Sequence, residues 1–145
     1  MASDQVKLDR TQLDHIDVEI DSDKQVATIT FNYPEKMNRV SMLARSQLRV
    51  LFEELDRDPS VRTIVLRGAG DKAFSAGGDI GGFLKYTPEE LSNLHENIAA
   101  PERCSKPVIS AVDGYCFGVA LELALAGDFI IATRRSTFAL PEVRL

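Results

Sequence analysis

The stretch "DGYCFGVALELALAGD", residues 113–128, gives the clearest evidence for the fold of this chain. Apolar and small residues fill nearly every position from Gly118 to Gly127, which predicts a buried helix. Glu122 lies in the middle of this apolar run. A buried carboxylate costs several kcal/mol unless it is paired, hydrogen-bonded or protonated. Glu122 is therefore the first candidate functional residue.

The segments on either side of this helix alternate between strand and helix patterns. Strands are predicted at 15–21, 25–32, 61–68, 106–115, 129–133 and 136–140, with helices at 41–58 and 87–98. Ser41 is the expected N-cap of the first helix, and Thr87 with Glu90 forms the capping box of the second. The consecutive apolar residues of 61–68 predict a strand buried on both faces. The alternation predicts one α/β domain.

Composition and charge exclude several classes of partner. The 145 residues carry a formal net charge of −5 and no run of Lys or Arg, so we expect no nucleic-acid partner. The two cysteines and two histidines lack metal-ligand spacing, which predicts no metal site. The polar N-terminus and the lack of an apolar run of about 18–20 residues predict a cytoplasmic protein without membrane contact. Residues 1–14 are predicted to be a flexible arm.

The glycine-rich stretch 68–82 allows more than one interpretation. Gly68, Gly70 and Ala73 match the loose dinucleotide pattern GxGxxA, but that pattern requires a helix to begin at once. Alternatively, Gly77 and Gly78 let a ligand approach the backbone N–H groups of a tight loop. Taken alone, the stretch is also typical of a plain surface loop.

Two motifs taken together resemble the crotonase (enoyl-CoA hydratase/isomerase) superfamily. They are "KAFSAGGDI", residues 72–80, and "KPVISAVDGYCFGVALELALAGDFIIA", residues 106–132. The resemblance implies an α/β fold built as a spiral of ββα units with two nearly perpendicular sheets. It extends over 15–145, and family chains are considerably longer. It therefore implies a core that is incomplete at the C-terminus, without the helices used in trimer assembly, and a parent protein that is a homotrimer or a dimer of trimers.

The same resemblance implies an oxyanion hole made of two backbone N–H groups, which fall on Gly78 and Val119. A helix N-terminus has unpaired N–H groups and a partial positive charge. One such donor, directed at a developing oxyanion, is worth on the order of 3 kcal/mol of barrier. The family usually has glycine where this chain has Val119, so we expect the valine side chain to reshape the acyl pocket.

Hydratases of this family use two glutamates, which fall on Glu122 and Glu142. Addition of water across the 2,3 double bond of an enoyl thioester needs a base for water and a proton for Cα, and two carboxyl groups can supply both. We expect the apolar neighbours of Glu122 to raise its pKa by desolvation. An ordinary helix glutamate that faces solvent or pairs with arginine is the alternative.

The resemblance also implies that coenzyme A is bound as part of the substrate, with no other cofactor. Its path would follow the loop 33–39 and the stretch 76–80. The candidate contacts are Lys36, Met37, Ala76, Gly78, Asp79 and Ile80. Lys36 and Arg39 either face phosphates or are solvated loop charges.

The predicted function is an enoyl-CoA hydratase whose substrate is an acyl-CoA. The second hypothesis is a related activity, either double-bond isomerisation or hydrolysis of a C–C bond in a CoA thioester. The third is a noncatalytic protein that binds CoA esters or acts as an assembly subunit.

Overall fold

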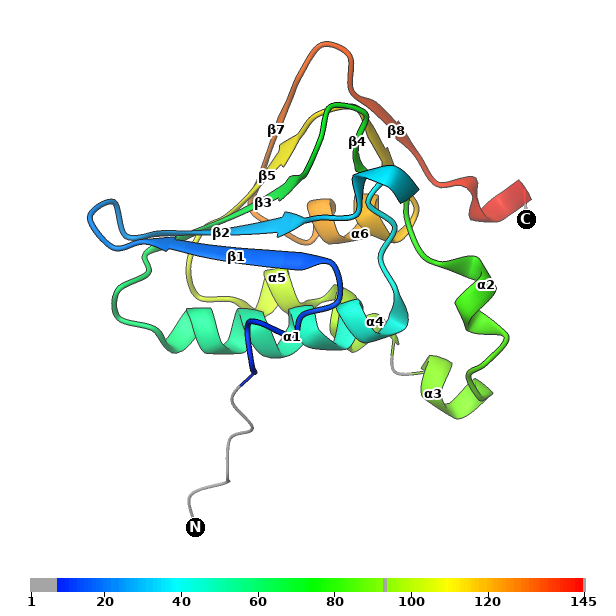
Figure 1. The fold of residues 1–145 in the computed structure, drawn as a ribbon, viewed down its shortest axis with the longest axis horizontal. Helices are drawn as coiled ribbons and strands as arrows, with labels where there is room; N and C mark the ends of the chain where they lie inside the picture. Colours follow the sequence, from blue (N-terminus) through cyan, green and yellow to red (C-terminus); the bar gives the residue numbers. More distant parts are fainter. Residues whose placement is uncertain (1–7, 93, 145) are drawn as a thin grey trace.

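The computed structural model describes residues 8–92 and 94–144. In this part of the chain, a larger sheet has the strand order β1-β2-β3-β5-β7 and a smaller one the order β4-β6-β8 (Figure 1). The strands are β1 Ile16–Asp21, β2 Val26–Phe31, β3 Thr63–Gly68, β4 Ala73–Ser75, β5 Val108–Val112, β6 Tyr115–Phe117, β7 Phe129–Ala132 and β8 Thr137–Ala139. The helical elements are η1 Pro34–Lys36, α1 Met42–Arg57, α2 Ile80–Phe83, α3 Pro88–Ser92, α4 Leu94–Ile98, α5 Ala100–Arg103, α6 Val119–Leu125 and η2 Pro141–Arg144. The predicted α/β fold with two sheets is confirmed.

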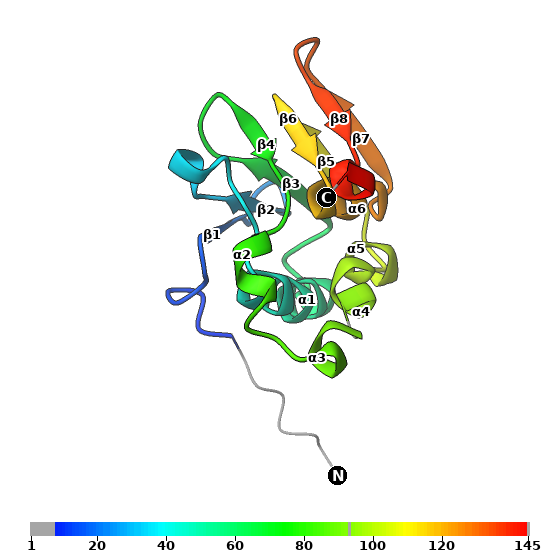
Figure 2. The same cartoon turned by 90° about the vertical axis from the view of Figure 1, so that its right-hand side faces the viewer.

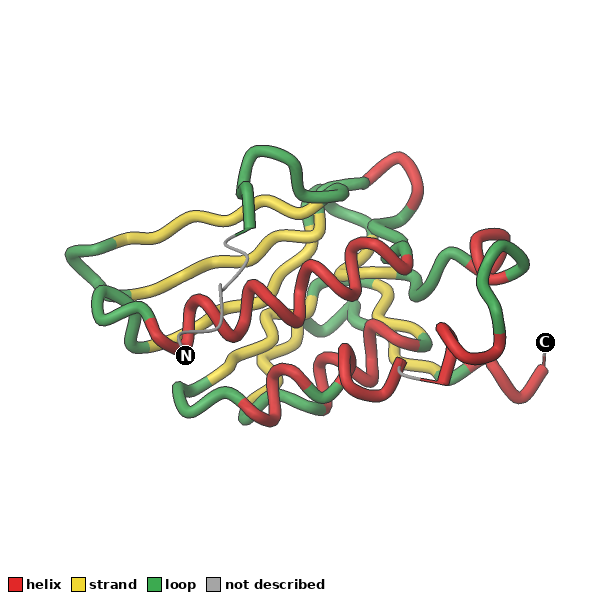
Figure 3. The backbone as a smooth tube through the Cα atoms, turned by 90° about the horizontal axis from the view of Figure 1, so that it is seen from below, coloured by secondary structure: helices red, strands yellow, loops and turns green. Residues whose placement is uncertain are grey.

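The N-terminal hairpin and the long helix α1 form the first layer of the core. Strands β1 and β2 pair antiparallel, and β2 then pairs parallel with β3 through the α1 crossover. The side chain of Ser41 accepts a hydrogen bond from the Ala44 N–H at 3.0 Å, as predicted for an N-cap. Figure 3 shows α1 lying over the strands, where its apolar face is buried in the core.

Consecutive strands are divided between the two sheets. Each strand of the pairs β3–β4, β5–β6 and β7–β8 joins a different sheet, and Figure 2 shows β6 between β4 and β8. Because of this, the single predicted strand 106–115 is wrong: β5 ends at Val112, and the chain turns at Asp113 and Gly114 before β6. Gly114 has φ +79°, and a Cβ there would overlap the carbonyl oxygen of Lys72.

The glycine-rich stretch contains a strand that the sequence did not predict. Residues Ala73–Ser75 form β4, which pairs parallel with β6. A strand therefore follows Gly70 where the dinucleotide pattern requires a helix, so the dinucleotide interpretation is wrong.

Two further predictions can be compared with the structure. The capping box is confirmed, since the Thr87 N–H donates to the Glu90 carboxylate at 2.8 Å and the Glu90 N–H donates back to the Thr87 hydroxyl. Residue 93 of the predicted helix 87–98 lies outside the described residues.

The prediction that the strand 61–68 is buried on both faces is wrong for β3. Its second face carries the exposed Arg67 and belongs to a polar hollow shared with Asp17 and Glu19.

Part of the predicted arm 1–14 lies against α1. The Leu8 N–H donates to the Glu54 carboxylate at 2.6 Å, and the Asp14 N–H donates to the Gln47 side chain at 2.8 Å. Residues 1–7 lie outside the described residues. None of the described helices is both long and apolar enough to cross a membrane.

Candidate active site

A cavity of about 290 Å³ brings together residues from five regions of the chain. Its lining comprises Arg45 from α1, the glycine loop with the start of α2, two residues of α4, and the starts of α6 and η2. The lining residues are Arg45, Ala76, Gly77, Gly78, Ile80, Leu94, Ile98, Gly118, Val119, Glu122, Pro141 and Glu142. Both predicted oxyanion donors and both predicted glutamates are therefore at one cavity.

The glycine loop is fixed in direct contact with the start of α6. Gly77 has φ +103°, and a Cβ there would lie 2.9 Å from the Phe117 carbonyl oxygen, so a side chain would separate the two segments. The Val40 N–H donates to the Gly77 carbonyl at 2.8 Å, and the Asp79 N–H donates to the Val40 carbonyl at 3.1 Å. These bonds hold the loop on both sides of Gly78.

The backbone N–H groups around the contact differ in whether they are already used. Those of Gly77 and Gly118 donate to the Ser75 hydroxyl and the Ala139 carbonyl, at 3.2 and 2.9 Å. Within the described residues, the N–H groups of Gly78 and Val119 donate to no protein acceptor. The two predicted donors are thus available to a ligand, and their role in an oxyanion hole stays a prediction.

The side chain of Val119 packs mainly into the core. The residue is only 4% exposed and belongs to the same buried cluster as Ala120 and Leu123. Val119 also lines the cavity. The expectation that its side chain reshapes the acyl pocket stays a prediction.

The carboxylates of Glu122 and Glu142 are exposed, so the expected burial of Glu122 is wrong. Helix α6 buries the face that carries Leu123 and Ala124, and Glu122 lies outside that face, toward the cavity. The carboxylate of Glu142 lies close to Gly118, where a Cβ would overlap its Oε1 atom. Gly118 also has φ +54° and ψ −130°, a conformation that only glycine adopts easily.

Arg45 is a charged residue of this site that was not predicted from the sequence. It is 5% exposed although it carries a full charge, and it lines the same cavity as Glu122 and Glu142. Burial lowers the pKa of the Arg45 guanidinium, and the charges of the two glutamates partly offset this. A signal was present: position 45 precedes Leu48 by three residues and Phe52 by seven, which places arginine on an apolar stripe.

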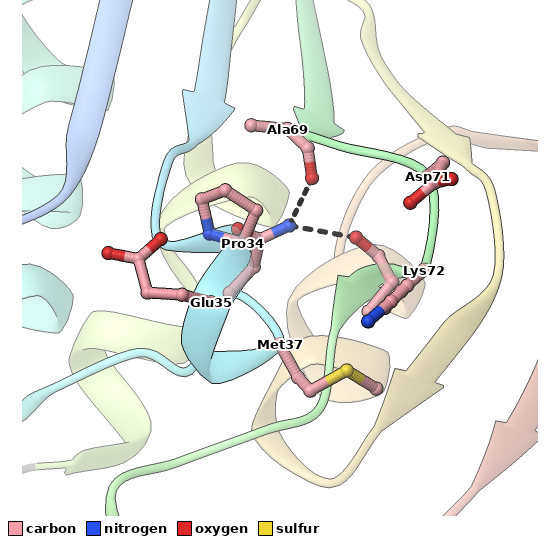
Figure 4. Close-up of a pocket in the computed structure, with 8 residues that line it drawn as sticks. Pro34, Glu35, Met37, Ala69, Asp71 and Lys72 are labelled. Carbon is pink, nitrogen blue, oxygen red and sulfur yellow. Dashed lines mark hydrogen bonds between the residues drawn. The ribbon is translucent and has the colours of Figure 1, made fainter.

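A second cavity, of about 240 Å³, lies beside the loop that follows β2 (Figure 4). It is lined by Pro34, Glu35, Met37, Asn38, Ala69, Asp71, Lys72 and Ala73. The side-chain amide of Asn38 donates to the carbonyl oxygens of Ala69 and Ala73, each at 2.8 Å, which are the bonds drawn in Figure 4. Met37 is thus the predicted coenzyme A contact that lies at this second cavity.

The remaining predicted coenzyme A contacts are divided. Ala76, Gly78 and Ile80 line the first cavity, whereas Lys36 and Asp79 line neither. Lys36 is exposed at the end of η1. Asp79 instead forms an ion pair with Arg39, with 3.2 Å between Oδ1 and Nη1.

Among residues 8–92 and 94–144, no group of three or more His, Cys, Asp or Glu side chains is arranged to hold a metal ion.

Paired strands that feed two sheets, with a glycine loop placed against a short helix, define the crotonase class of fold. A family model described as enoyl-CoA hydratase/isomerase matches residues 21–145, and the chain belongs to this family. It is 36% identical over 135 residues to carnitinyl-CoA dehydratase of Escherichia coli (strain K12), a match that covers 83% of this chain and 47% of the relative.

Solved structures give the same result. The enoyl-CoA hydratase/isomerase from Xanthobacter autotrophicus Py2 superposes with a TM-score of 0.82 at 31% identity, covering 92% of this chain and 51% of that one. The enoyl-CoA hydratase from Bacillus anthracis gives 0.79 at 28% identity, covering 90% and 52%. The chain therefore spans about half the length of the relatives that it matches.

Proposed function

We propose that this chain forms the oxyanion-hole half of an enoyl-CoA hydratase, which adds water across the 2,3 double bond of a 2-enoyl-CoA. The observation that carries the proposal is the cavity where two unused backbone N–H groups face the same space as two carboxylates. Membership of the enoyl-CoA hydratase/isomerase family supports a CoA thioester as substrate. The dehydratase among the relatives is named for the removal of water, which is the reverse of this reaction.

In the proposed reaction the thioester oxygen accepts hydrogen bonds from the N–H groups of Gly78 and Val119. Glu122, as carboxylate, takes a proton from water while the water oxygen bonds to C3 of the substrate. The electrons of the double bond move toward the thioester oxygen, where the two donors stabilise the negative charge. Glu142, as carboxylic acid, then gives a proton to C2, and transfer of one proton between the two carboxyl groups restores the starting state.

Coenzyme A is proposed to be held along the two loops that the sequence indicates. Ala76, Gly78 and Ile80 would follow the part of the substrate nearest the reaction. Met37 lines the second cavity together with Lys72, and this cationic side chain suits a phosphate. Lys36 is exposed nearby and could provide a further positive charge. The reaction needs no other cofactor.

Isomerisation of an enoyl-CoA is the second candidate, because the matching family model covers hydratases and isomerases alike. Moving a double bond transfers one proton between two carbon atoms and consumes no water. A single carboxylate can perform both proton transfers, so the two activities differ in how many glutamates they need.

The test uses the full-length protein with crotonyl-CoA, following the loss of absorbance of the conjugated thioester. Glu122→Gln and Glu142→Gln should each lower kcat by about 10²–10⁴-fold, the usual contribution of a general acid or base. Glu89→Gln, at an exposed helix position away from the cavity, is the matched control and should leave kcat unchanged.

Three results would change the assignment. If no 2-enoyl-CoA loses absorbance with the wild-type protein, the hydratase proposal is wrong. Conversion of a 3-enoyl-CoA that survives in one glutamine variant favours the isomerase. Tight binding of a CoA ester without any turnover favours a noncatalytic binding or assembly role.

We propose that the full-length protein assembles as a homotrimer or a dimer of trimers. Its molar mass, measured by light scattering on a sizing column, tests this, and the mass of a monomer would contradict it.

A further inference from the structure

The direction of the Gly78 N–H group depends on a hydrogen bond made by the neighbouring carbonyl group. This N–H and the Gly77 carbonyl belong to one planar trans peptide unit, in which the two groups point in opposite directions. The Gly77 carbonyl accepts a hydrogen bond from the Val40 N–H at 2.8 Å. Any rotation that redirects the Gly78 N–H therefore weakens the bond to Val40, so the segment around Val40 sets the direction of this donor.

That segment is joined to the glycine loop by backbone bonds and by one ion pair. The Asp79 N–H donates to the Val40 carbonyl at 3.1 Å, and next to this bond Arg39 Nη1 lies 3.2 Å from Asp79 Oδ1. Val40 is 2% exposed, whereas the side chain of Arg39 is 41% exposed. The backbone bonds are thus anchored in the core at Val40, and the ion pair joins the same two segments on the side that faces solvent.

The Arg39 guanidinium is held at two points. Besides its contact with Asp79, its Cζ atom lies 5.6 Å from the centroid of the Tyr33 ring, within the range of a cation–π contact. The Tyr33 ring in turn stacks on His15, with 3.7 Å between the ring centroids. The guanidinium thus has fixed neighbours, unlike a freely solvated loop charge.

We propose that Arg39 is a positioning residue, whose ion pair with Asp79 keeps the glycine loop against Val40 and so directs the Gly78 N–H at the thioester oxygen. The inference rests on the proposed function, because it concerns one of the two donors assigned to that oxygen. The sequence allows Arg39 to face a phosphate or solvent, and the ion pair assigns it a role in the reaction instead.

A misdirected donor and a lost phosphate contact have different kinetic effects. A phosphate contact binds the ground state and the transition state alike, so its loss raises KM and leaves kcat unchanged. A donor in an oxyanion hole binds the transition state more strongly, so misdirecting it lowers kcat. Loss of a whole donor costs about 10²–10³-fold in kcat. Loss of an ion pair and a cation–π contact that only hold the donor should cost about three- to tenfold.

The first test compares crotonyl-CoA with crotonyl-pantetheine, the same thioester without phosphate groups, in the full-length protein. Arg39→Met should lower kcat about three- to tenfold with both substrates and change KM little. With crotonyl-pantetheine, Asp79→Asn should lower kcat by a similar factor, and the double variant should be no slower than the slower single variant, because both changes remove the same contact. Arg49→Met, which removes a similarly exposed ion pair with Glu53 on α1, is the matched control and should change neither kcat nor KM.

Two kinetic results would overturn the proposal. One is a higher KM for crotonyl-CoA alone with an unchanged kcat in Arg39→Met, which would make Arg39 a phosphate contact. The other is a double variant whose loss of kcat is the product of the two single losses, which would mean that Arg39 and Asp79 act independently.

The second test needs no activity and follows amide hydrogen exchange in the full-length protein by mass spectrometry. In Arg39→Met, the bonded amides of Val40 and Asp79 should exchange about three- to tenfold faster, because the ion pair no longer opposes local opening of the contact. Arg49→Met should leave their exchange unchanged. Unchanged exchange in Arg39→Met overturns the proposal whether or not the protein is a hydratase. Faster exchange in a protein that hydrates no 2-enoyl-CoA would refute the hydratase assignment and still support Arg39 as the residue that holds the loop.

Discussion

Replacement of Asn38 by alanine should strongly destabilise the fold, because its buried side chain makes three hydrogen bonds. Asn38 is 1% exposed and has φ +54°. Its Oδ1 accepts from the Tyr33 N–H at 2.9 Å, and its Nδ2 donates to the carbonyls of Ala69 and Ala73, each at 2.8 Å. One side chain thus ties the loop after β2 to the connection between β3 and β4.

The expected loss of stability has two parts: the hydrogen bonds that alanine cannot make, and the strain of alanine in a left-handed backbone conformation. Each hydrogen bond contributes about 1 kcal/mol net, so the loss of three costs about 3 kcal/mol. Alanine in the left-handed conformation adds about 1 kcal/mol, because asparagine tolerates that region better. Asn38→Ala should therefore lower the free energy of unfolding by about 3–4 kcal/mol. Asn38→Gly should recover the backbone part, about 1 kcal/mol.

Equilibrium urea unfolding of the full-length protein, followed by circular dichroism, measures these differences. Asn32→Ala is the control, because Asn32 makes one exposed bond to Asp17 at 2.6 Å and its loss should cost about 1 kcal/mol at most. If Asn38→Ala also costs less than about 1 kcal/mol, the three bonds do not stabilise the loop and the reasoning is wrong.

Three further changes test other parts of the structure. Gly118→Ala places a Cβ against the Glu142 carboxylate and strains the backbone, so kcat/KM should fall at least about tenfold. An unchanged kcat/KM would contradict the close packing of Gly118 and Glu142. Hydrogen bonds from Arg135, then Thr133, hold the pKa of Asp113 at about 2, below its ordinary 3.8. Its contribution to stability is thus present above about pH 4 and lost toward pH 2, and Asp113→Asn should flatten that part of the urea-midpoint profile. Ser41→Ala removes an N-cap and should lower the free energy of unfolding by about 1 kcal/mol in the same assay, whereas no change would show that the cap is dispensable.

The elements that the sequence predicted well are those with a strong local pattern. Helix α1 has both an apolar stripe and a capping serine, and the hairpin β1–β2 alternates apolar and polar residues. The sequence did not predict the division of strands between two sheets. The residues of 106–115 remain suitable for a strand throughout, and only the close approach of Gly114 to Lys72 shows why the chain turns there. That approach is a tertiary contact between segments far apart in the sequence.

The candidate site also has features that the sequence indicated and features that depend on the fold. The family resemblance indicated Gly78 and Val119 as backbone donors, and within the described residues neither N–H group donates to a protein acceptor. The environment of the carboxylates could not be predicted. Apolar neighbours in the sequence suggested that Glu122 is buried, but a helix has two faces, and this residue lies on the exposed one.

Arg45 combines a local signal with a tertiary one. Its place on the apolar stripe of α1 can be read from the sequence. Its presence at the cavity that Glu122 and Glu142 line depends on the fold, because α1 and α6 are far apart in the sequence.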